Sequence, residues 1–278
     1  MRPEQREGCD GGDDPALHET ALVGGDVNVG DRAVVRVGDT VRRPTGPHTD
    51  AVDALLRHFE TVGFDGAPRP LGRDARGRQM LSFVDGEPGL SPVPGGDDVV
   101  RELGRLLRRM HDAQEGFVAP ADALWHAFPL APPGGDVICH HDLFPPNVIF
   151  REGHPTAFID WDLAAPSPRL YDVASAANFW APLAHDERAR QFGLPVDRKG
   201  MRLRLLCDGY GLRSSDRLEL LDVVAHRNRM GYEIHRLYGG ERRLPGWTEM
   251  WDAGSGDEIL KRSAWFEAHR ADLQRSLR

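Results

Sequence analysis

The chain is poor in cysteine and lysine, and it has no long hydrophobic run. Its three cysteines, Cys9, Cys139 and Cys207, are widely spaced, which argues against a disulfide framework and predicts a reducing, cytoplasmic location. No apolar run reaches the ~20 residues of a membrane span. The first residues are charged rather than apolar, so we expect no secretory signal and no contact with a membrane. The only lysines, Lys199 and Lys261, stand in the last third of the sequence.

The charge of the chain is unevenly distributed. Residues 173–278 hold 15 acidic and 18 basic side chains (+3), so residues 1–172 hold 28 acidic and 17 basic ones (−11), which together give the net charge of −8. No stripe of lysine and arginine with interleaved aromatics is present, and nucleic acid is not an expected partner. With 278 residues, of which 40% are hydrophobic and 28% charged, the chain is large enough for two lobes around a substantial core.

One stretch in the middle of the chain carries the clearest chemical signal. Asp142 precedes Asn147 by five residues, and two apolar runs that predict a β-hairpin follow, at 148–150 and 156–159. Asp160 comes directly after the second run. A carboxylate, a carboxamide and a second carboxylate in this order suit phosphoryl transfer, which needs a base for the attacking hydroxyl and oxygen ligands for Mg²⁺.

These residues resemble the signatures of a known family. His140-His141-Asp142, four residues and Asn147, followed by Ile159-Asp160-Trp161-Asp162, resemble the H-G-D-x-x-x-x-N and I-D-W/F motifs of the aminoglycoside phosphotransferases and choline kinase-like enzymes. This family is related to the protein kinases. The resemblance implies an α+β, protein-kinase-like fold of two lobes, with a small β-rich N-lobe and a larger, mainly helical C-lobe.

The resemblance also implies roles for individual residues. Asp142 would be the catalytic base, and Asn147 and Asp160 would hold Mg²⁺. His140 would shape the loop, and Asp172, in a similar P-x-x-x-D-V-A segment, would brace it. Two further positions are less settled, because His141 replaces the usual glycine and Asp162 would either reach a second Mg²⁺ or cap the following turn.

ATP or GTP would bind between the lobes. A glycine-rich hairpin with Gly24, Gly25 and Asn28 would cover the phosphates, since glycine lets backbone N–H groups approach an anion. Backbone groups of the hinge at Ser82, Phe83 and Val84 would contact the base. These nucleotide-binding residues are assigned by their order along the chain relative to Asp142.

An arginine must replace the phosphate-clamping lysine, because no lysine precedes Asp142. We expect Arg42 to be this clamp, although Arg43 would take the role if the strand faces the other way. The helix predicted at residues 50–59 carries Val52 where the family has the glutamate that pairs with the clamp, and Asp53 is the candidate substitute.

The predicted organisation is a lead-in at residues 1–20, an N-lobe at 21–84 and a C-lobe at 85–278. The predicted reaction transfers the γ-phosphoryl group to a hydroxyl of a small molecule, with an antibiotic as the leading acceptor, and the chain would act as a monomer or a homodimer. The basic balance of residues 173–278 speaks against a polycationic aminoglycoside. A kinase of choline, an amino acid or a sugar, a nucleotide-binding pseudokinase and a metal hydrolase built on His140 and His141 are the alternatives.

Overall fold

The computed structural model describes residues 19–22, 34–89, 96–126 and 134–278. The predicted phosphate loop with Gly24, Gly25 and Asn28 lies outside the described residues, as does nearly all of the predicted lead-in. Within these ranges, no helix has both the length and the apolar character that a membrane crossing requires.

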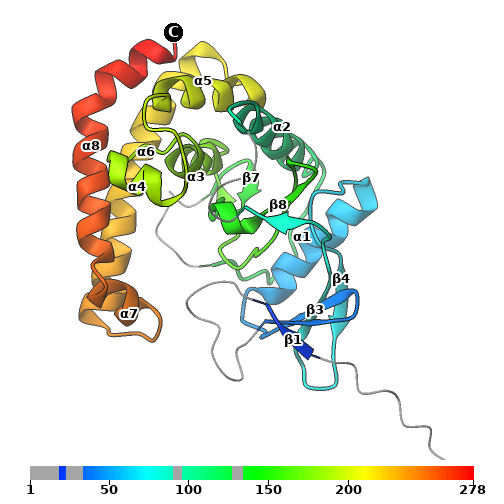
Figure 1. Ribbon diagram of the computed structural model, residues 1–278. Helices are drawn as coiled ribbons and strands as arrows, with labels where there is room; N and C mark the ends of the chain where they lie inside the picture. The colour runs from blue at the N-terminus through cyan, green and yellow to red at the C-terminus, as the bar shows by residue number, and fades with distance from the viewer. Residues whose placement is uncertain (1–18, 23–33, 90–95, 127–133) are drawn as a thin grey trace, which may run out of the picture.

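The first part of the chain builds a five-stranded sheet with one helix beside it (Figure 1). In chain order, its elements are β1 (Glu19–Ala21), β2 (Val35–Val37), β3 (Thr40–Arg43), α1 (Thr49–Val62), β4 (Pro70–Arg73) and β5 (Gln79–Ser82). The strands are ordered β1-β2-β3-β5-β4, and every neighbouring pair is antiparallel. The hairpin between β2 and β3 turns at Gly38, whose φ of 58° suits glycine.

Helix α1 forms because apolar residues recur on one of its faces. Val52, Leu55, Leu56 and Phe59 are all buried, so this face joins the core. The helix ends at Gly63, which adopts the left-handed conformation that commonly terminates helices. The expected helix is therefore present and is longer at both ends than the predicted range 50–59.

A second group of short strands lies between the sheet and the helices. It comprises β6 (Glu87–Pro88) and, after helix α2 (Asp98–Asp112), β7 (Val137–Cys139), the 3-10 turn η2 (Pro145–Asn147), β8 (Val148–Arg151), β9 (His154–Phe158) and β10 (Ala165–Ser167). Strands β8 and β9 pair antiparallel, with Val148 opposite Phe158, and β7 pairs with β10. The predicted hairpin around residues 151–155 is thus confirmed.

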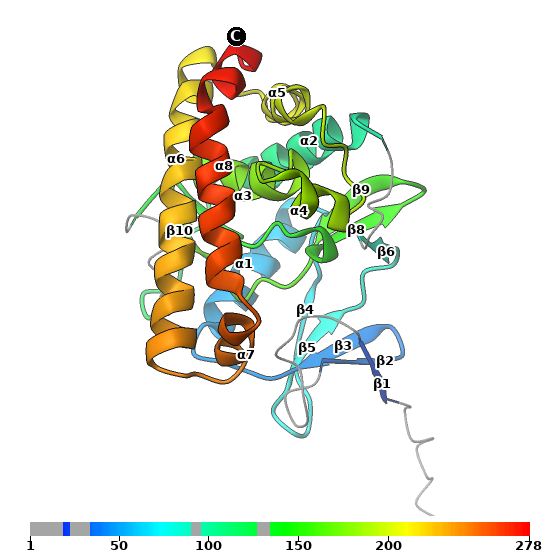
Figure 2. The same cartoon turned by 60° about the vertical axis from the view of Figure 1, so that its left-hand side comes forward.

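The remainder of the chain is helical. It contains α3 (Leu170–Trp180), α4 (Asp186–Gln191), α5 (Lys199–Tyr210), α6 (Ser214–Ile234), the π-helical segment η3 (His235–Glu241), α7 (Trp247–Asp252) and α8 (Ser255–Ser276). Figure 2 shows the two long helices α6 and α8 running side by side, joined at one end by η3 and α7. A small sheet-bearing part and a larger helical part agree with the predicted fold class.

Helices α2 and α5 cross at close range because each has a glycine at the contact. A Cβ atom at Gly104 would lie 2.5 Å from the backbone oxygen of Leu206, and one at Gly209 would lie 2.0 Å from that of Arg101. Neither backbone can give way, so only glycine permits this approach. The crossing holds α2, with its buried stripe of apolar side chains, firmly against the helical part.

Candidate active site

Three of the predicted site residues, His140, Asp142 and Asn147, lie on one loop, His140–Asn147, which we call the HHD loop. It leaves strand β7 and leads through η2 into β8. The Nδ2 atom of Asn147 donates to Asp142 Oδ2 at 2.8 Å and to the Asp142 backbone oxygen at 3.0 Å. This bonding fixes the Asp142 carboxylate and leaves the Asn147 amide oxygen as the atom that can bind a cation.

Asp160 is brought to the same place by the β8–β9 hairpin. The backbone N–H of Ile159 donates to the backbone oxygen of Asn147 at 2.9 Å, so the residue that follows it lies beside the HHD loop. Asp160 is exposed and has a φ of 63°, a left-handed conformation that asparagine and aspartate tolerate better than most residues. Burial raises the pKa of Asp142, and the negative charge of Asp160 raises it further, against the opposing effects of His140 and Asn147.

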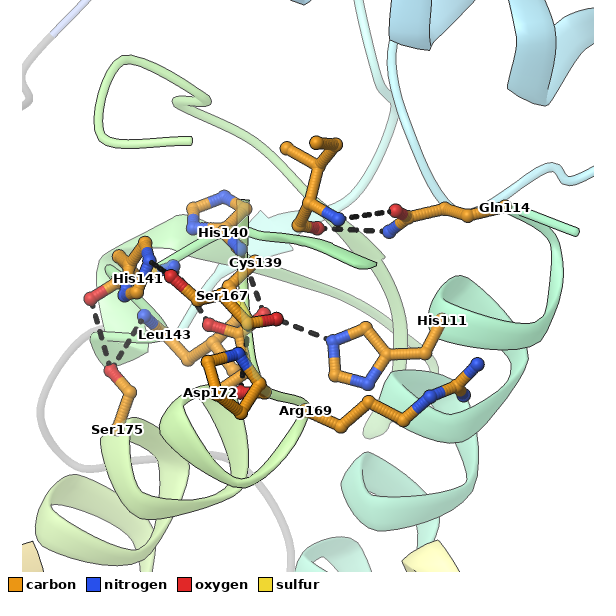
Figure 3. Close-up of polar contacts among 12 residues, drawn as sticks. His111, Gln114, Cys139, His140, His141, Leu143, Ser167, Arg169, Asp172 and Ser175 are labelled. Carbon is orange, nitrogen blue, oxygen red and sulfur yellow. Dashed lines mark hydrogen bonds and ion pairs between the residues drawn. The ribbon is translucent and has the colours of Figure 1, made fainter. Parts of the chain in front are cut away.

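Asp172 secures the HHD loop from below (Figure 3). Its buried carboxylate accepts the backbone N–H of His140 through Oδ2 and that of His141 through Oδ1, both at 2.7 Å, and also contacts His111 Nε2 at 3.1 Å. Burial alone would raise the pKa of Asp172, but the bond to His111 and the neighbouring histidines hold this pKa far below its usual range. Asp172 is therefore a buried anion that fixes the loop backbone.

His141 adopts the conformation that would suit the glycine of the related motif. Its φ is 65°, and its buried side chain is held on both ring nitrogens. Nε2 lies 2.7 Å from Ser167 Oγ, and Nδ1 lies 3.2 Å from Nη1 of Arg227. Burial lowers the pKa of His141 to about 4, so the ring is neutral at pH 7.

His140 is fixed in a different way. Its Nε2 lies 2.9 Å from the backbone oxygen of Ile159, and its Nδ1 accepts the N–H of Asp142 at 3.3 Å. His140 therefore ties the HHD loop to the end of the β8–β9 hairpin. Both histidines of the loop use both ring nitrogens within the protein, which speaks against the metal hydrolase alternative.

The structure differs from the prediction at the phosphate clamp. Arg43, not Arg42, reaches the site, where its Nη2 donates to Asp160 Oδ1 at 2.9 Å and also to Asp162. Arg42 instead donates to Thr40 and approaches Asp74 to 3.9 Å. Neighbouring residues of a strand point to opposite faces, so only one of the two arginines can face the site.

Asp53 does not pair with either arginine. It is buried and accepts hydrogen bonds from Arg73 Nη1 at 2.7 Å and from Gln79 Nε2 at 2.6 Å. Gln79 lies directly opposite Arg43 in the sheet. Asp53 therefore supports the strand next to the clamp rather than the clamp itself, and Val52 packs in the core.

Asp162 faces Arg43 and His48. The imidazole of His48, which no sequence motif selects, lies 3.5 Å from Asp162 Oδ1 through its Nε2 atom. Burial acts to raise the pKa of Asp162, but the bond from His48 and the charge of Arg43 outweigh it and lower this pKa. Asp162 is thus a carboxylate that belongs to the same group of charges as Asp160.

The hinge offers fewer backbone donors than expected. The N–H of Ser82 donates to Arg69 and that of Phe83 to Asp39, both at 2.8 Å. In the described part of the chain this leaves the N–H of Val84 as the hinge donor that can contact a base. The guanidinium of Arg36 lies 3.6 Å from the centre of the Phe83 ring.

Two aromatic side chains of the helical part, Trp180 and Tyr210, are buried and support the HHD loop. Trp180 is fully buried and donates from Nε1 to the backbone oxygen of Leu143 at 2.9 Å. The hydroxyl of Tyr210 lies 2.8 Å from His111 Nδ1.

Three ligand-type groups, His111, Cys139 and Asp172, lie within 4.8 Å of one another. The hydrogen bonds of His111 and Asp172 are already satisfied by the protein, so these three groups carry no metal site.

Comparison with known proteins agrees with the family resemblance of the sequence motifs. Residues 114–203 match the family described as phosphotransferase enzyme family. The chain is 37% identical over 269 residues to the trifolitoxin immunity protein of Rhizobium leguminosarum bv. trifolii, covering 93% of this chain and 98% of that protein. It is 31% identical over 206 residues to the homoserine kinase of Brucella anthropi, covering 72% of this chain but only 54% of that enzyme.

Solved structures share the fold at low sequence identity. An amicoumacin kinase in complex with AMP-PNP, Ca²⁺ and Ami has a TM-score of 0.65 at 12% identity, covering 91% of this chain and 89% of that one. A choline/ethanolamine kinase family protein from Mesorhizobium loti has a TM-score of 0.55 at 14% identity, covering 94% and 91%. These likenesses show the protein-kinase-like fold of small-molecule kinases.

Proposed function

The chain belongs to the phosphotransferase enzyme family, and from this we propose that it transfers the γ-phosphoryl group of ATP or GTP to a hydroxyl of a small molecule. The observation that carries the proposal is the contact of Asn147 with Asp142 beside Asp160. A base, an amide oxygen and a second carboxylate at one point are the groups that this reaction needs.

Asp142 takes the role of base. It accepts the proton of the acceptor hydroxyl while the hydroxyl oxygen bonds to the γ-phosphorus and the bond from that phosphorus to the leaving nucleoside diphosphate breaks. Its raised pKa makes its carboxylate a stronger base than that of an ordinary aspartate. Asn147 supports this role by fixing the orientation of Asp142.

The donor set fits a divalent cation. Asp160 is exposed at the site and its charge disfavours ionisation of Asp142, a repulsion that a bound cation relieves. The Asn147 amide oxygen and the Asp160 carboxylate would hold Mg²⁺, and Asp162 is close enough to the same charges to assist. When bound, Mg²⁺ neutralises the phosphate oxygens of the nucleotide.

Arg43 is the proposed phosphate clamp in place of Arg42. It comes from the sheet, it is buried, and its charge is directed to the cation ligands. Burial opposes the charge of this guanidinium, but Asp160 and Asp162 keep the pKa of Arg43 raised. A planar, permanently charged group at this place suits the oxygens of a polyphosphate.

The relatives suggest two classes of acceptor. The immunity protein confers, by its name, protection from a toxin, which suits modification of an antibiotic-like molecule. The homoserine kinases act, by their name, on a metabolite hydroxyl, and the chain spans about half of their length. Fold alone does not choose between these classes.

The test is a nucleotide-consumption screen of the purified protein with Mg²⁺, over antibiotics, hydroxy amino acids, choline and sugars. Asp142→Asn is expected to lower kcat by roughly 10²- to 10⁴-fold and to leave nucleotide affinity nearly unchanged. Binding of Mg·ATP with no transfer to any acceptor, in wild type as in Asp142→Asn, would instead support a pseudokinase.

A further inference from the structure

Three arginines of the helical part differ from the others in their pairing. Among the arginines of the described residues, those that are at least partly buried form an ion pair with a carboxylate in every case but three. The exceptions are Arg188 on α4, Arg227 on α6 and Arg262 on α8. The other unpaired arginines of these ranges are exposed to solvent, where a charge needs no partner.

Arg227 and Arg262 approach each other across the contact of α6 with α8. Gly231 lies one helical turn after Arg227 and therefore on the same face of α6. A Cβ atom at Gly231 would lie 3.9 Å from Nη2 of Arg262, so this guanidinium lies against the glycine, next to Arg227. His235 lies one turn further along the chain. Burial and the charge of Arg262 lower the pKa of His235.

Two of the three arginines, Arg227 and Arg188, are linked to the HHD loop. Arg227 donates from Nη2 to the backbone oxygen of His141 at 3.0 Å, immediately before Asp142. The guanidinium of Arg188 lies 4.7 Å from the centre of the Phe192 ring, and this ring packs edge-on against Phe144 at 5.6 Å. Arg227 therefore reaches the loop beside Asp142 from helix α6 of the helical part, whereas Arg43 comes from strand β3 of the five-stranded sheet.

This arrangement is costly in the absence of an anion. Burial, together with the charges of Arg188 and Arg227, lowers the pKa of Arg262 to about 10. The buried Nε of Arg262 has no hydrogen-bond partner in the described structure. Buried charges are normally paired, and an unsatisfied buried donor destabilises a fold. The acidic group whose charge acts on Arg188 is Glu258, which is already bound by His185 and Lys261.

We propose that Arg188, Arg227 and Arg262 bind an oxyanion group of the acceptor, a carboxylate, sulfate or phosphate, while the acceptor hydroxyl faces Asp142. This inference rests on the proposed phosphotransferase function and specifies its acceptor as an anion. Guanidinium groups match the geometry of such oxyanions. A polycation would meet repulsion at the same place, in agreement with the excess of three positive charges in residues 173–278.

The test uses the full chain with saturating Mg·AMP-PNP, so that added anions do not compete for the nucleotide site. Thermal unfolding is followed with malonate, sulfate or glycerol 3-phosphate, against sodium chloride at equal ionic strength. We expect at least one of these anions to raise the Tm of the wild type saturably at low millimolar concentration, and the series distinguishes a carboxylate from a sulfate or phosphate site. Arg262→Met is expected to weaken this anion binding at least tenfold.

Two further readouts separate a binding role from a purely structural one. Without anions, Arg262→Met should have a Tm equal to or above that of the wild type, because it removes an unpaired buried charge. Arg229→Met, which removes an exposed and unpaired arginine of the same helix α6, is the matched control and should keep the anion response. The inference is overturned if no anion exceeds sodium chloride, or if Arg262→Met lowers the Tm and binds anions as the wild type does.

Assays of phosphoryl transfer with the same protein preparations test the proposed function separately. If the wild type binds anions, Arg262→Met does not, and no hydroxyl compound is phosphorylated, the anion site is retained and the transferase function is rejected. Transfer to neutral or cationic acceptors, with KM unchanged in Arg262→Met, would retain the transferase and reject the anion site. Where a hydroxy acid is the acceptor, its methyl ester should be a much poorer one.

Discussion

The guanidinium of Arg43 donates to the carboxylate of Asp160 at 2.9 Å, and these two residues come from different parts of the fold. Arg43 ends strand β3 of the five-stranded sheet, whereas Asp160 follows strand β9 of the hairpin that begins at the HHD loop. Arg43 also contacts Asp162. This ion pair links the sheet to the carboxylates proposed to hold Mg²⁺, and the first prediction depends on it.

Arg43→Ala should impair nucleotide binding far more than Arg42→Ala. A charge-assisted hydrogen bond to a phosphate is worth roughly 1.5–3 kcal/mol, which corresponds to a rise in the KM for ATP of about 10- to 100-fold. Arg42, whose side chain is bound to Thr40, should change this KM by less than about threefold. Steady-state kinetics of both variants check the prediction, and a larger effect of Arg42→Ala would restore the assignment made from the sequence.

His141→Asn should make stability less dependent on pH in mild acid. The pKa of His141 is about 4 in the folded state and about 6.5 when unfolded. Between these values the unfolded state binds more protons, so the wild type loses stability as the pH falls, by roughly 3 kcal/mol in total. Asparagine tolerates the φ of 65° and does not titrate.

The comparison is made by urea unfolding at pH 7.5 and pH 4.5. His141→Asn should be less stable than the wild type at pH 7.5, because the contacts of His141 with Ser167 and Arg227 are lost. This deficit should shrink at pH 4.5. An equal deficit at the two pH values would contradict the burial of a neutral imidazole.

Asp172→Asn should destabilise the protein by about 3 kcal/mol at neutral pH. The two carboxylate oxygens accept the N–H groups of His140 and His141, whereas asparagine has one acceptor oxygen and would oppose one N–H with its own donor. Because the pKa of Asp172 is lowered in the folded state, its contribution is complete above about pH 4 and diminishes as the pH falls further.

The measurement is again the free energy of unfolding from urea titration. Asp112→Asn is the matched control, since Asp112 forms half-exposed ion pairs with Arg108 and Arg169 and should cost less than about 1 kcal/mol. Similar losses in the two variants would mean that Asp172 does not hold the HHD loop.

Gly209→Ala should destabilise the crossing of α2 and α5. The added Cβ would lie 2.0 Å from the backbone oxygen of Arg101, so the helices must separate, at a cost of at least about 2 kcal/mol. Gly96→Ala, where a Cβ meets nothing within 4 Å, should be close to neutral. Thermal unfolding of the pair tests this, and equal Tm values would show that the crossing is looser than described.

The sequence alone was sufficient for the fold class and for the family. The spacing of Asp142, Asn147 and Asp160 around two apolar runs is a local pattern, because a hairpin and the loop before it are contiguous in the chain. The apolar stripes of α1 and α2 are equally local, since the helical spacing of apolar residues can be seen within each segment. The site roles of these three residues stay predictions, and the kinetics of Asp142→Asn test the role of the first.

The tertiary structure decided what depends on residues far apart in the chain. Arg42 and Arg43 are adjacent and chemically identical, and only the pairing of β3 within the sheet determines which of them faces Asp160. Arg188, Arg227 and Arg262 stand on three separate helices, and no periodicity relates them. Their lack of carboxylate partners is a property of how α4, α6 and α8 pack, because an ion pair depends on distance in space rather than on separation in sequence.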